Sequence, residues 1–133
     1  MLLSCGRPLH VAATGGNLSV IEQLLQHGAD IDSRDIYGCT ALHCAAQHGK
    51  AAVIQQLVSA GADVDLQQHE GATGVYLATY FGHTDIVDLL VSFGACLTLS
   101  DRNGHTALDI ARQTDNWHLI QIIHEALNDG TEV

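Results

Sequence analysis

Residues 38–46 are Gly38-Cys39-Thr40-Ala41-Leu42-His43-Cys44-Ala45-Ala46, and this segment contains the clearest local signals of structure in the sequence. Gly38 is a turn residue, and Thr40 suits a helix N-cap because its hydroxyl accepts a backbone N–H that the first helical turn leaves unpaired. The residues after Thr40 contain neither glycine nor proline until Gly49. A short helix is therefore expected over Ala41–Gln47.

The features of this stretch return every 33 residues. Thr40, Thr73 and Thr106 share one register, in which Arg7 also stands. Four periods of 33 residues account for 132 of the 133 positions. Because a fixed period of this length is the signature of a repeat architecture, we expect one domain over residues 1–133. Its repeats would span about residues 2–34, 35–67, 68–100 and 101–133.

Each period also predicts a second helix, which is amphipathic. In the first period Val20, Ile21, Leu24 and Leu25 form an apolar stripe along one helix face. A glycine follows this helix in the first three periods, where a left-handed C-cap favours it. One helix pair cannot bury its own apolar face, so the pairs must stack. The expected fold class is all-α: a solenoid of stacked helix-turn-helix repeats with short hairpin turns.

The segment 38–46, followed by Gly49 and by Gly61-Ala62-Asp63-Val64-Asp65, resembles an ankyrin repeat, and residues 7–13 and 28–32 resemble the same family. The resemblance implies an ankyrin-repeat solenoid over the whole chain. It also implies a non-enzymatic protein–protein interaction module that binds a segment of a partner protein on the concave face of the array. The alternative is an ankyrin regulatory or targeting fragment of a larger enzyme or receptor, whose chemistry lies outside this chain.

Three positions depart from the repeat pattern. Tyr76 stands in the register of His43, Asp115 stands in the register of Gly49, and His124 replaces an apolar residue. The last repeat also ends without a new hairpin. Since the outer face of a terminal repeat must be soluble, the departures in the last repeat indicate a C-terminal cap.

The charge balance restricts the partner. Lys and Arg number 5 against 15 Asp and Glu, a formal net charge of -10, which argues against nucleic acid and anionic membranes. No apolar run approaches the roughly 18 residues of a membrane span. The expected partner is therefore a basic or apolar peptide segment. Residues 1–6 do not form a secretory signal, and a repeat core does not need the four cysteines as disulfides, so we expect a cytoplasmic or nuclear protein.

No motif in the sequence predicts catalysis or a cofactor, because the chain has no nucleophile elbow, no phosphate-binding glycine loop and no zinc-protease helix. Cys39, His43, Cys44 and His48 could together hold zinc. One helix rarely presents four tetrahedral ligands, so we favour structural roles and expect no metal site. The resemblance implies that His10 and His43 hydrogen-bond neighbouring backbone or threonine.

The candidate binding residues are the positions that differ most between repeats, since residues common to all four serve the scaffold. One group lies in the turn before each first helix, and the other lies at the end of that helix. Three of the six aromatic residues fall in these groups, and aromatic side chains are frequent interface anchors. The resemblance implies that both groups face the concave side. The candidates are Arg34, Ile36, Tyr37, Gln47, His48, His69, Glu70, Tyr80, Phe81, Arg102, Asn103, His105 and Gln113.

The last three residues, Thr131-Glu132-Val133, resemble the ligand of a PDZ domain. Such a ligand adds a strand to a sheet edge and inserts its carboxylate into a backbone nest. Residues 128–130 would then serve as a flexible spacer. The alternative is a frayed tail without a binding role.

Overall fold

The computed structural model describes residues 7–131 and contains four helix pairs, with no strand in that part of the chain. This confirms the expected all-α repeat fold, and each expected first helix begins at its predicted residue. The pairs fall inside the four predicted repeats. The helices are α1 (Pro8–Gly15), α2 (Leu18–Gln26), α3 (Ala41–Gln47), α4 (Ala51–Ser59), α5 (Gly74–Tyr80), α6 (Thr84–Ser92), α7 (Ala107–Gln113) and α8 (Trp117–Thr131).

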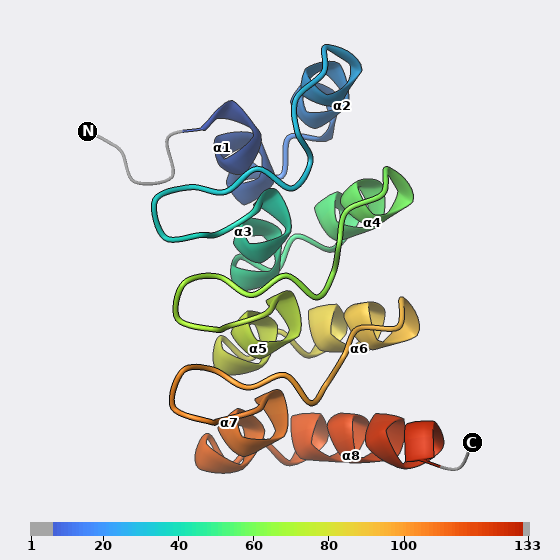
Figure 1. Cartoon of the computed structure of the whole chain (residues 1–133). Helices are drawn as coiled ribbons and strands as arrows, with labels where there is room; N and C mark the ends of the chain where they lie inside the picture. Colours follow the sequence, from blue (N-terminus) through green and yellow to red (C-terminus); the bar gives the residue numbers. More distant parts are fainter. Residues whose placement is uncertain (1–6, 132–133) are drawn as a thin grey trace.

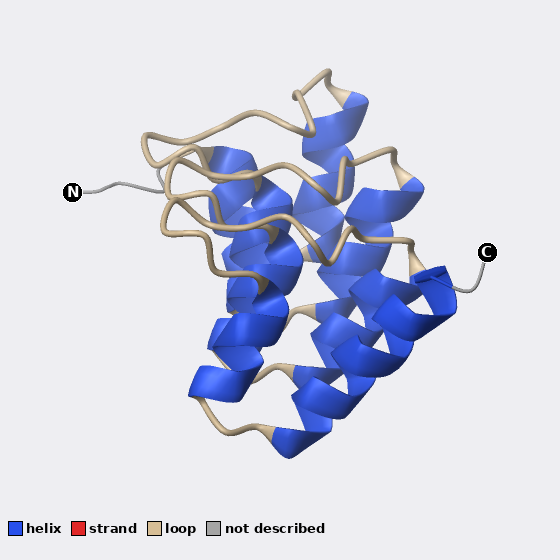
Figure 2. Cartoon of the chain, turned by 60° about the horizontal axis from the view of Figure 1, so that its bottom comes forward, coloured by secondary structure: helices blue, strands red, loops and turns tan. Residues whose placement is uncertain are grey.

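The helices form two columns. Helices α1, α3, α5 and α7, which we call the inner helices, stack in one column, and α2, α4, α6 and α8, the outer helices, stack in the other (Figure 1). The loops that lead from each outer helix to the next inner helix project together from one side of the stack (Figure 2). We call their tips, residues 35–39, 68–72 and 101–105, the hairpins. The hairpins therefore lie side by side along the stack.

Threonine caps three of the four inner helices. The hydroxyls of Thr40, Thr73 and Thr106 each accept a hydrogen bond from the backbone N–H three residues on, at 3.4, 3.1 and 3.3 Å. This confirms the N-cap expected at Thr40. Arg7, which stands in the same register, occupies the N-cap position of α1, but its side chain makes no capping hydrogen bond there.

The core lies between successive helix pairs. Ile21, Ile54 and Val87 occupy one register of the outer helices and are fully buried. On the inner helices, alanines such as Ala45 and Ala78 are equally buried and let neighbouring helices approach closely. Contacts are therefore local, each pair packing on the next, as in a one-dimensional array.

Buried histidines join successive repeats. His10 Nε2 lies 2.7 Å from the carbonyl oxygen of Cys39, and His43 Nε2 lies 3.2 Å from that of Ala72. Each ring therefore bonds backbone of the following repeat, the role that the resemblance implied. Tyr76 replaces the histidine in repeat three, and its hydroxyl donates to Asp101 Oδ2 at 2.6 Å.

The other departures also have structural consequences. Asp115 keeps the left-handed backbone of the glycines whose register it shares, with φ 57°. Helix α8 continues to Thr131 and is longer than the other outer helices. Within residues 7–131, no helix has both the length and the apolar character needed to cross a bilayer.

Candidate functional site

The hairpins hold the first group of candidates at the surface. Ile36 and Tyr37 are 69 % and 53 % exposed, although both side chains are largely apolar. His69 and Glu70 in the next hairpin are exposed, as are Arg102 and Asn103 in the third. These six residues occupy two adjacent registers, so the structure places equivalent side chains in rows across the hairpins.

Backbone hydrogen bonds hold successive hairpins together. The His69 N–H donates to the Tyr37 carbonyl oxygen at 2.9 Å, and the Arg102 N–H donates to that of Glu70 at the same distance. Within the third hairpin, Asp101 Oδ1 accepts the N–H groups of Asn103 and His105. A surface supported in this way is ordered before binding, which lowers the entropic cost of association.

Two candidates of this group also make structural contacts. Arg34 Nη1 donates to the carbonyl oxygens of Gly38 and Gln67, both at 2.9 Å, and so joins the first hairpin to the residue that precedes the second. Gln67 occupies the same register and makes the equivalent bonds one repeat later. His105 Nδ1 lies 3.7 Å from Asp101 Oδ2. The sequence predicted a binding role for Arg34 and did not reveal this bridge.

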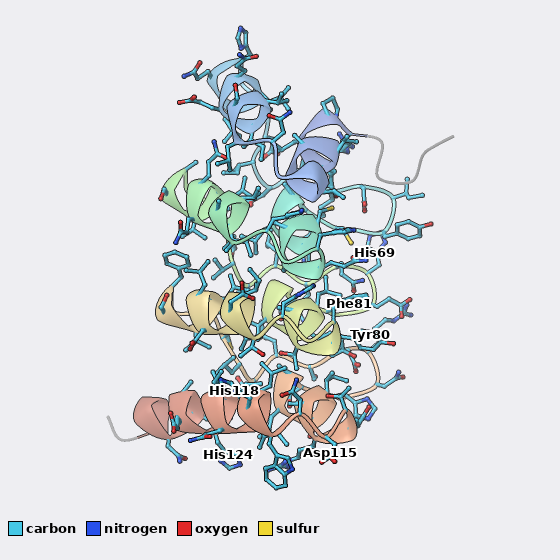
Figure 3. The ribbon with its side chains drawn as sticks, turned by 180° about the vertical axis from the view of Figure 1, so that it is seen from behind. His69, Tyr80, Phe81, Asp115, His118 and His124 are labelled. Atoms are coloured by element: carbon cyan, nitrogen blue, oxygen red, sulfur yellow. The ribbon has the colours of Figure 1, made fainter. Side chains whose placement is uncertain are left out.

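The ends of the inner helices carry the second group. Tyr80 and Phe81 end helix α5, are 58 % and 47 % exposed, and place their ring centroids 5.1 Å apart in an edge-to-face arrangement. Figure 3 shows both rings beside α5, with His69 in the neighbouring hairpin. In the same registers, His48 and Gln113 are exposed and Gln47 is half-buried. We call Gln47, His48, Tyr80, Phe81, Gln113 and Thr114 the inner stripe.

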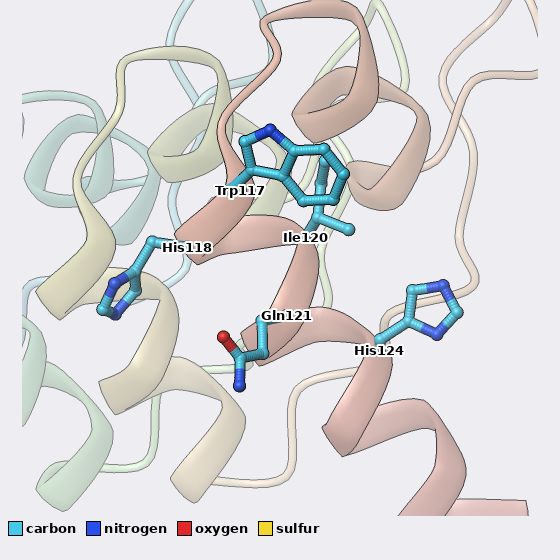
Figure 4. Close-up of a pocket in the computed structure, with 5 residues that line it drawn as sticks. All are labelled: Trp117, His118, Ile120, Gln121 and His124. Carbon is cyan, nitrogen blue, oxygen red and sulfur yellow. The ribbon is translucent and has the colours of Figure 1, made fainter.

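Sequence reasoning missed Trp117, which at 74 % is the most exposed large apolar side chain in the described part of the chain. It begins α8 and lies in an open pocket with His118, Ile120, Gln121 and His124 (Figure 4). A signal was present in the sequence: the single tryptophan occupies a register that holds Leu18, Ala51 and Thr84 elsewhere. That register lies outside the two groups that the repeat comparison selected.

The two histidines among the four residues considered for zinc make hydrogen bonds within the fold. His43 Nδ1 accepts the Thr40 N–H at 3.0 Å, while its Nε2 faces the carbonyl oxygens of Leu66 and Ala72. His48 Nδ1 lies 2.9 Å from the Cys44 carbonyl oxygen. Both nitrogens of His43 are therefore engaged by backbone. Across residues 7–131, no three metal-ligating side chains gather into a group that could hold an ion.

The prediction that residues 128–130 form a flexible spacer before the PDZ-like C-terminal sequence is wrong. Residues 128–130 are helical, because α8 runs through Thr131. A PDZ ligand pairs as an extended strand, which a helix does not provide. Glu132 and Val133, which carry the rest of the predicted ligand, lie outside the described residues.

Comparison with known families agrees with this geometry. The model of ankyrin repeats, which describes three copies, matches residues 3–68 and again residues 46–131. The two matches together cover nearly the whole chain and overlap in the second repeat. A search among curated proteins found no match.

Proposed function

The chain belongs to the ankyrin-repeat family, and we propose that it is a non-enzymatic interaction module that binds a segment of a partner protein. The binding surface is the side formed by the inner stripe and the hairpins. The observation that carries the proposal is the exposed aromatic pair Tyr80–Phe81. Other repeats place Gln47, His48, Gln113 and Thr114 in the same registers, so the scaffold does not require aromatic rings there.

The charge on this surface indicates what kind of segment binds. The chain carries a formal charge of -10, yet the inner stripe contains no carboxylate and no lysine or arginine. In the hairpins the exposed carboxylate is that of Glu70, which Arg102 offsets. The carboxylates of Asp35 and Asp101 are less exposed and accept backbone N–H groups of their own hairpins. Electrostatic attraction of a basic peptide would need a concentration of carboxylates there. Of the two partner classes expected, basic and apolar, we therefore favour an apolar segment with hydrogen-bonding groups.

The experiment compares three variants: Tyr80→Ala with Phe81→Ala, Phe93→Ala, and Trp117→Ala. Each variant is first used to capture proteins from a lysate and is then titrated calorimetrically with each captured partner. Tyr80→Ala with Phe81→Ala should weaken binding by about 2 kcal/mol or more, roughly a 30-fold rise in Kd, because a central aromatic anchor is lost. Phe93→Ala is the matched control, since Phe93 is a similarly exposed ring at the end of outer helix α6. Circular dichroism checks that all variants keep the fold.

The outcomes locate the site. A partner lost by the double variant and kept by Phe93→Ala supports the proposal. A partner that tolerates the double variant and is lost by Trp117→Ala would instead bind the end of the stack. Titration at two salt concentrations tests the partner class, because binding of an apolar segment should change little with ionic strength.

The expected location in the cytoplasm or nucleus also remains a proposal. Imaging of a tagged full chain in cells tests it directly.

A further inference from the structure

We propose that Asn103, in the third hairpin, is a modification site whose side-chain amide is lost through a cyclic imide formed with the backbone nitrogen of Gly104. Asparagine is a thermally labile residue, and its amide is most reactive where glycine follows, because glycine has no side chain to hinder ring closure. Asn103 is the only one of the four asparagines that glycine follows. The inference goes beyond the proposed binding role and does not depend on it.

The reaction needs water as its only co-reactant. The Gly104 nitrogen attacks Cγ of Asn103 and loses its proton, a C–N bond forms, and the side-chain nitrogen leaves as ammonia. Water then opens the imide at one of its two carbonyl carbons. Breaking the new C–N bond leaves aspartate. Breaking the original peptide bond leaves isoaspartate, in which the backbone runs through the former side-chain carbon.

The structure leaves the reacting groups accessible. Asn103 and Gly104 are both exposed, and the Asn103 side-chain amide makes no hydrogen bond to any residue that the structure describes. A side-chain carbon placed on Gly104 would meet no heavy atom within 4 Å beyond its chain neighbours. Nothing in the fold therefore obstructs the forming ring.

The other three asparagines are held in ways that oppose the same reaction. Asn17 and Asn116 precede outer helices, and their Oδ1 atoms accept backbone N–H groups three residues on, at 3.3 and 3.2 Å. The bulky residues leucine and tryptophan follow them. Asn128 lies within helix α8, where helical hydrogen bonds hold the next backbone nitrogen. The three residues thus serve as controls within one chain.

Two hydrogen bonds to Asp101 control the attack. The Gly104 N–H donates to the Asp101 carbonyl oxygen at 3.0 Å, and the Asn103 N–H donates to Asp101 Oδ1 at 2.8 Å. The nitrogen of Gly104 must leave its acceptor before the ring can close, so the reaction follows local opening of the hairpin. Tyr76 donates to the same carboxylate and therefore slows this opening.

The product alters the hairpin in two ways. Aspartate or isoaspartate at position 103 adds a carboxylate beside Arg102, the residue whose charge offsets that of Glu70. Isoaspartate also adds one carbon to the backbone between the two N–H groups, of Asn103 and His105, that share Asp101 Oδ1. The longer backbone cannot keep both bonds, so the hairpin loosens.

The test incubates the full folded chain in mildly alkaline buffer, beside a sample unfolded in urea, and locates converted residues by peptide mass spectrometry. In the folded chain Asn103 should convert, more slowly than in the unfolded sample, while Asn17 and Asn116 stay intact. An Asn103 amide that survives in the folded chain after the unfolded sample has converted would overturn the proposal. Equal conversion of the three asparagines in the folded chain would overturn it as well.

Two variants test the control by the hairpin. Tyr76→Phe should speed conversion of Asn103 about 5-fold, the factor expected when opening breaks one hydrogen bond fewer. Tyr80→Phe removes a hydroxyl from an exposed ring and should leave the rate unchanged. The same rate in both variants and the wild type would refute control by opening.

A last comparison tests the product. Ion exchange separates the isoaspartate form, and Asn103→Asp supplies the same charge without the additional carbon. Hydrogen exchange of the His105 amide should be faster in the isoaspartate form than in Asn103→Asp. Equal exchange in the two would show that the hairpin keeps its bonds, contrary to the proposal.

Discussion

The residue before each inner helix is threonine in three repeats and Arg7 in the first. In repeat two, Thr40 bonds both the backbone of α3 and the ring of His43. In repeat one Arg7 provides neither bond, and Nδ1 of the buried His10 has no hydrogen-bond partner in the described structure. A buried polar atom without a partner destabilises a fold.

Arg7→Thr should therefore stabilise the chain by about 1 kcal/mol, the usual value of an N-cap. Urea unfolding measures the free-energy change. Arg7→Ala serves as the control, because it removes the arginine without supplying a cap. If both variants unfold at the same urea concentration, the hydroxyl has no role at this position.

His43 makes the stability depend on pH. Burial lowers the pKa of its imidazole below the ordinary value of 6.5, and Nδ1 already accepts the Thr40 N–H. The folded chain thus holds His43 neutral, while the unfolded chain takes up a proton near pH 6.5. Its contribution to stability is complete above that pH and is lost progressively as the pH falls below it.

The measurement is the free energy of unfolding at several pH values between about 7.5 and 5. The wild type should lose stability over this range, and His43→Gln should lose less because it cannot titrate. His48→Gln, which alters an exposed histidine at the end of the same helix, should follow the wild type. Parallel curves for His43→Gln and the wild type would contradict the argument.

At the scale of the elements, Tyr76 ties helix α5 to the third hairpin. Its hydroxyl donates to Asp101, and this bond is the main reason that the pKa of the Asp101 carboxyl lies below its usual value. Burial, together with the same bond, raises the pKa of the Tyr76 hydroxyl. The helix and the hairpin are therefore coupled through one carboxylate.

Tyr76→Phe should raise the pKa of Asp101 in an NMR titration. It should also speed hydrogen exchange of the Asn103 and His105 amides, which donate to the same carboxylate. Tyr80→Phe removes a hydroxyl from an exposed ring and should change neither quantity. An unchanged Asp101 pKa in Tyr76→Phe would show that the backbone donors alone set it.

The elements themselves were predictable because each helix carries local signals. Thr40 and its equivalents mark the starts of inner helices, and the 33-residue register extends each signal to the other repeats. Helix α8 was the exception. Asn128 and Gly130 are poor helix residues, so the sequence favoured a spacer there, yet α8 continues to Thr131.

Features that depend on how repeats meet were less predictable. The bridge from Arg34 to the Gln67 carbonyl oxygen joins residues 33 apart, and only the stacked geometry brings them together. Exposure at the ends of the stack has the same origin: Val20 and Val53 share a residue type and a register, but only Val53 is covered. The exposure of Tyr80 and Phe81 was predictable, because the residue types in their two registers vary between repeats.

At the scale of the whole molecule, stability should vary along the stack, because each helix pair contacts only its neighbours. Ile21 and Ile54 offer a matched pair, since both are isoleucines in one register and both are fully buried. Truncating either to alanine removes the same atoms and costs about 2–5 kcal/mol locally. The two changes differ only in position, as Ile21 lies in the terminal pair and Ile54 lies in the second.

Ile21→Ala should therefore loosen α1 and α2 and leave the other helices protected, because a terminal pair can unfold without breaking more than one interface. Ile54→Ala weakens a pair that contacts neighbours on both sides, so protection should fall in α1 to α4 together and the main unfolding transition should move to lower urea. Hydrogen exchange followed by mass spectrometry resolves the helices separately. A uniform loss of protection along the chain in both variants would mean that the four pairs unfold as one unit, and the nearest-neighbour description would then fail for this protein.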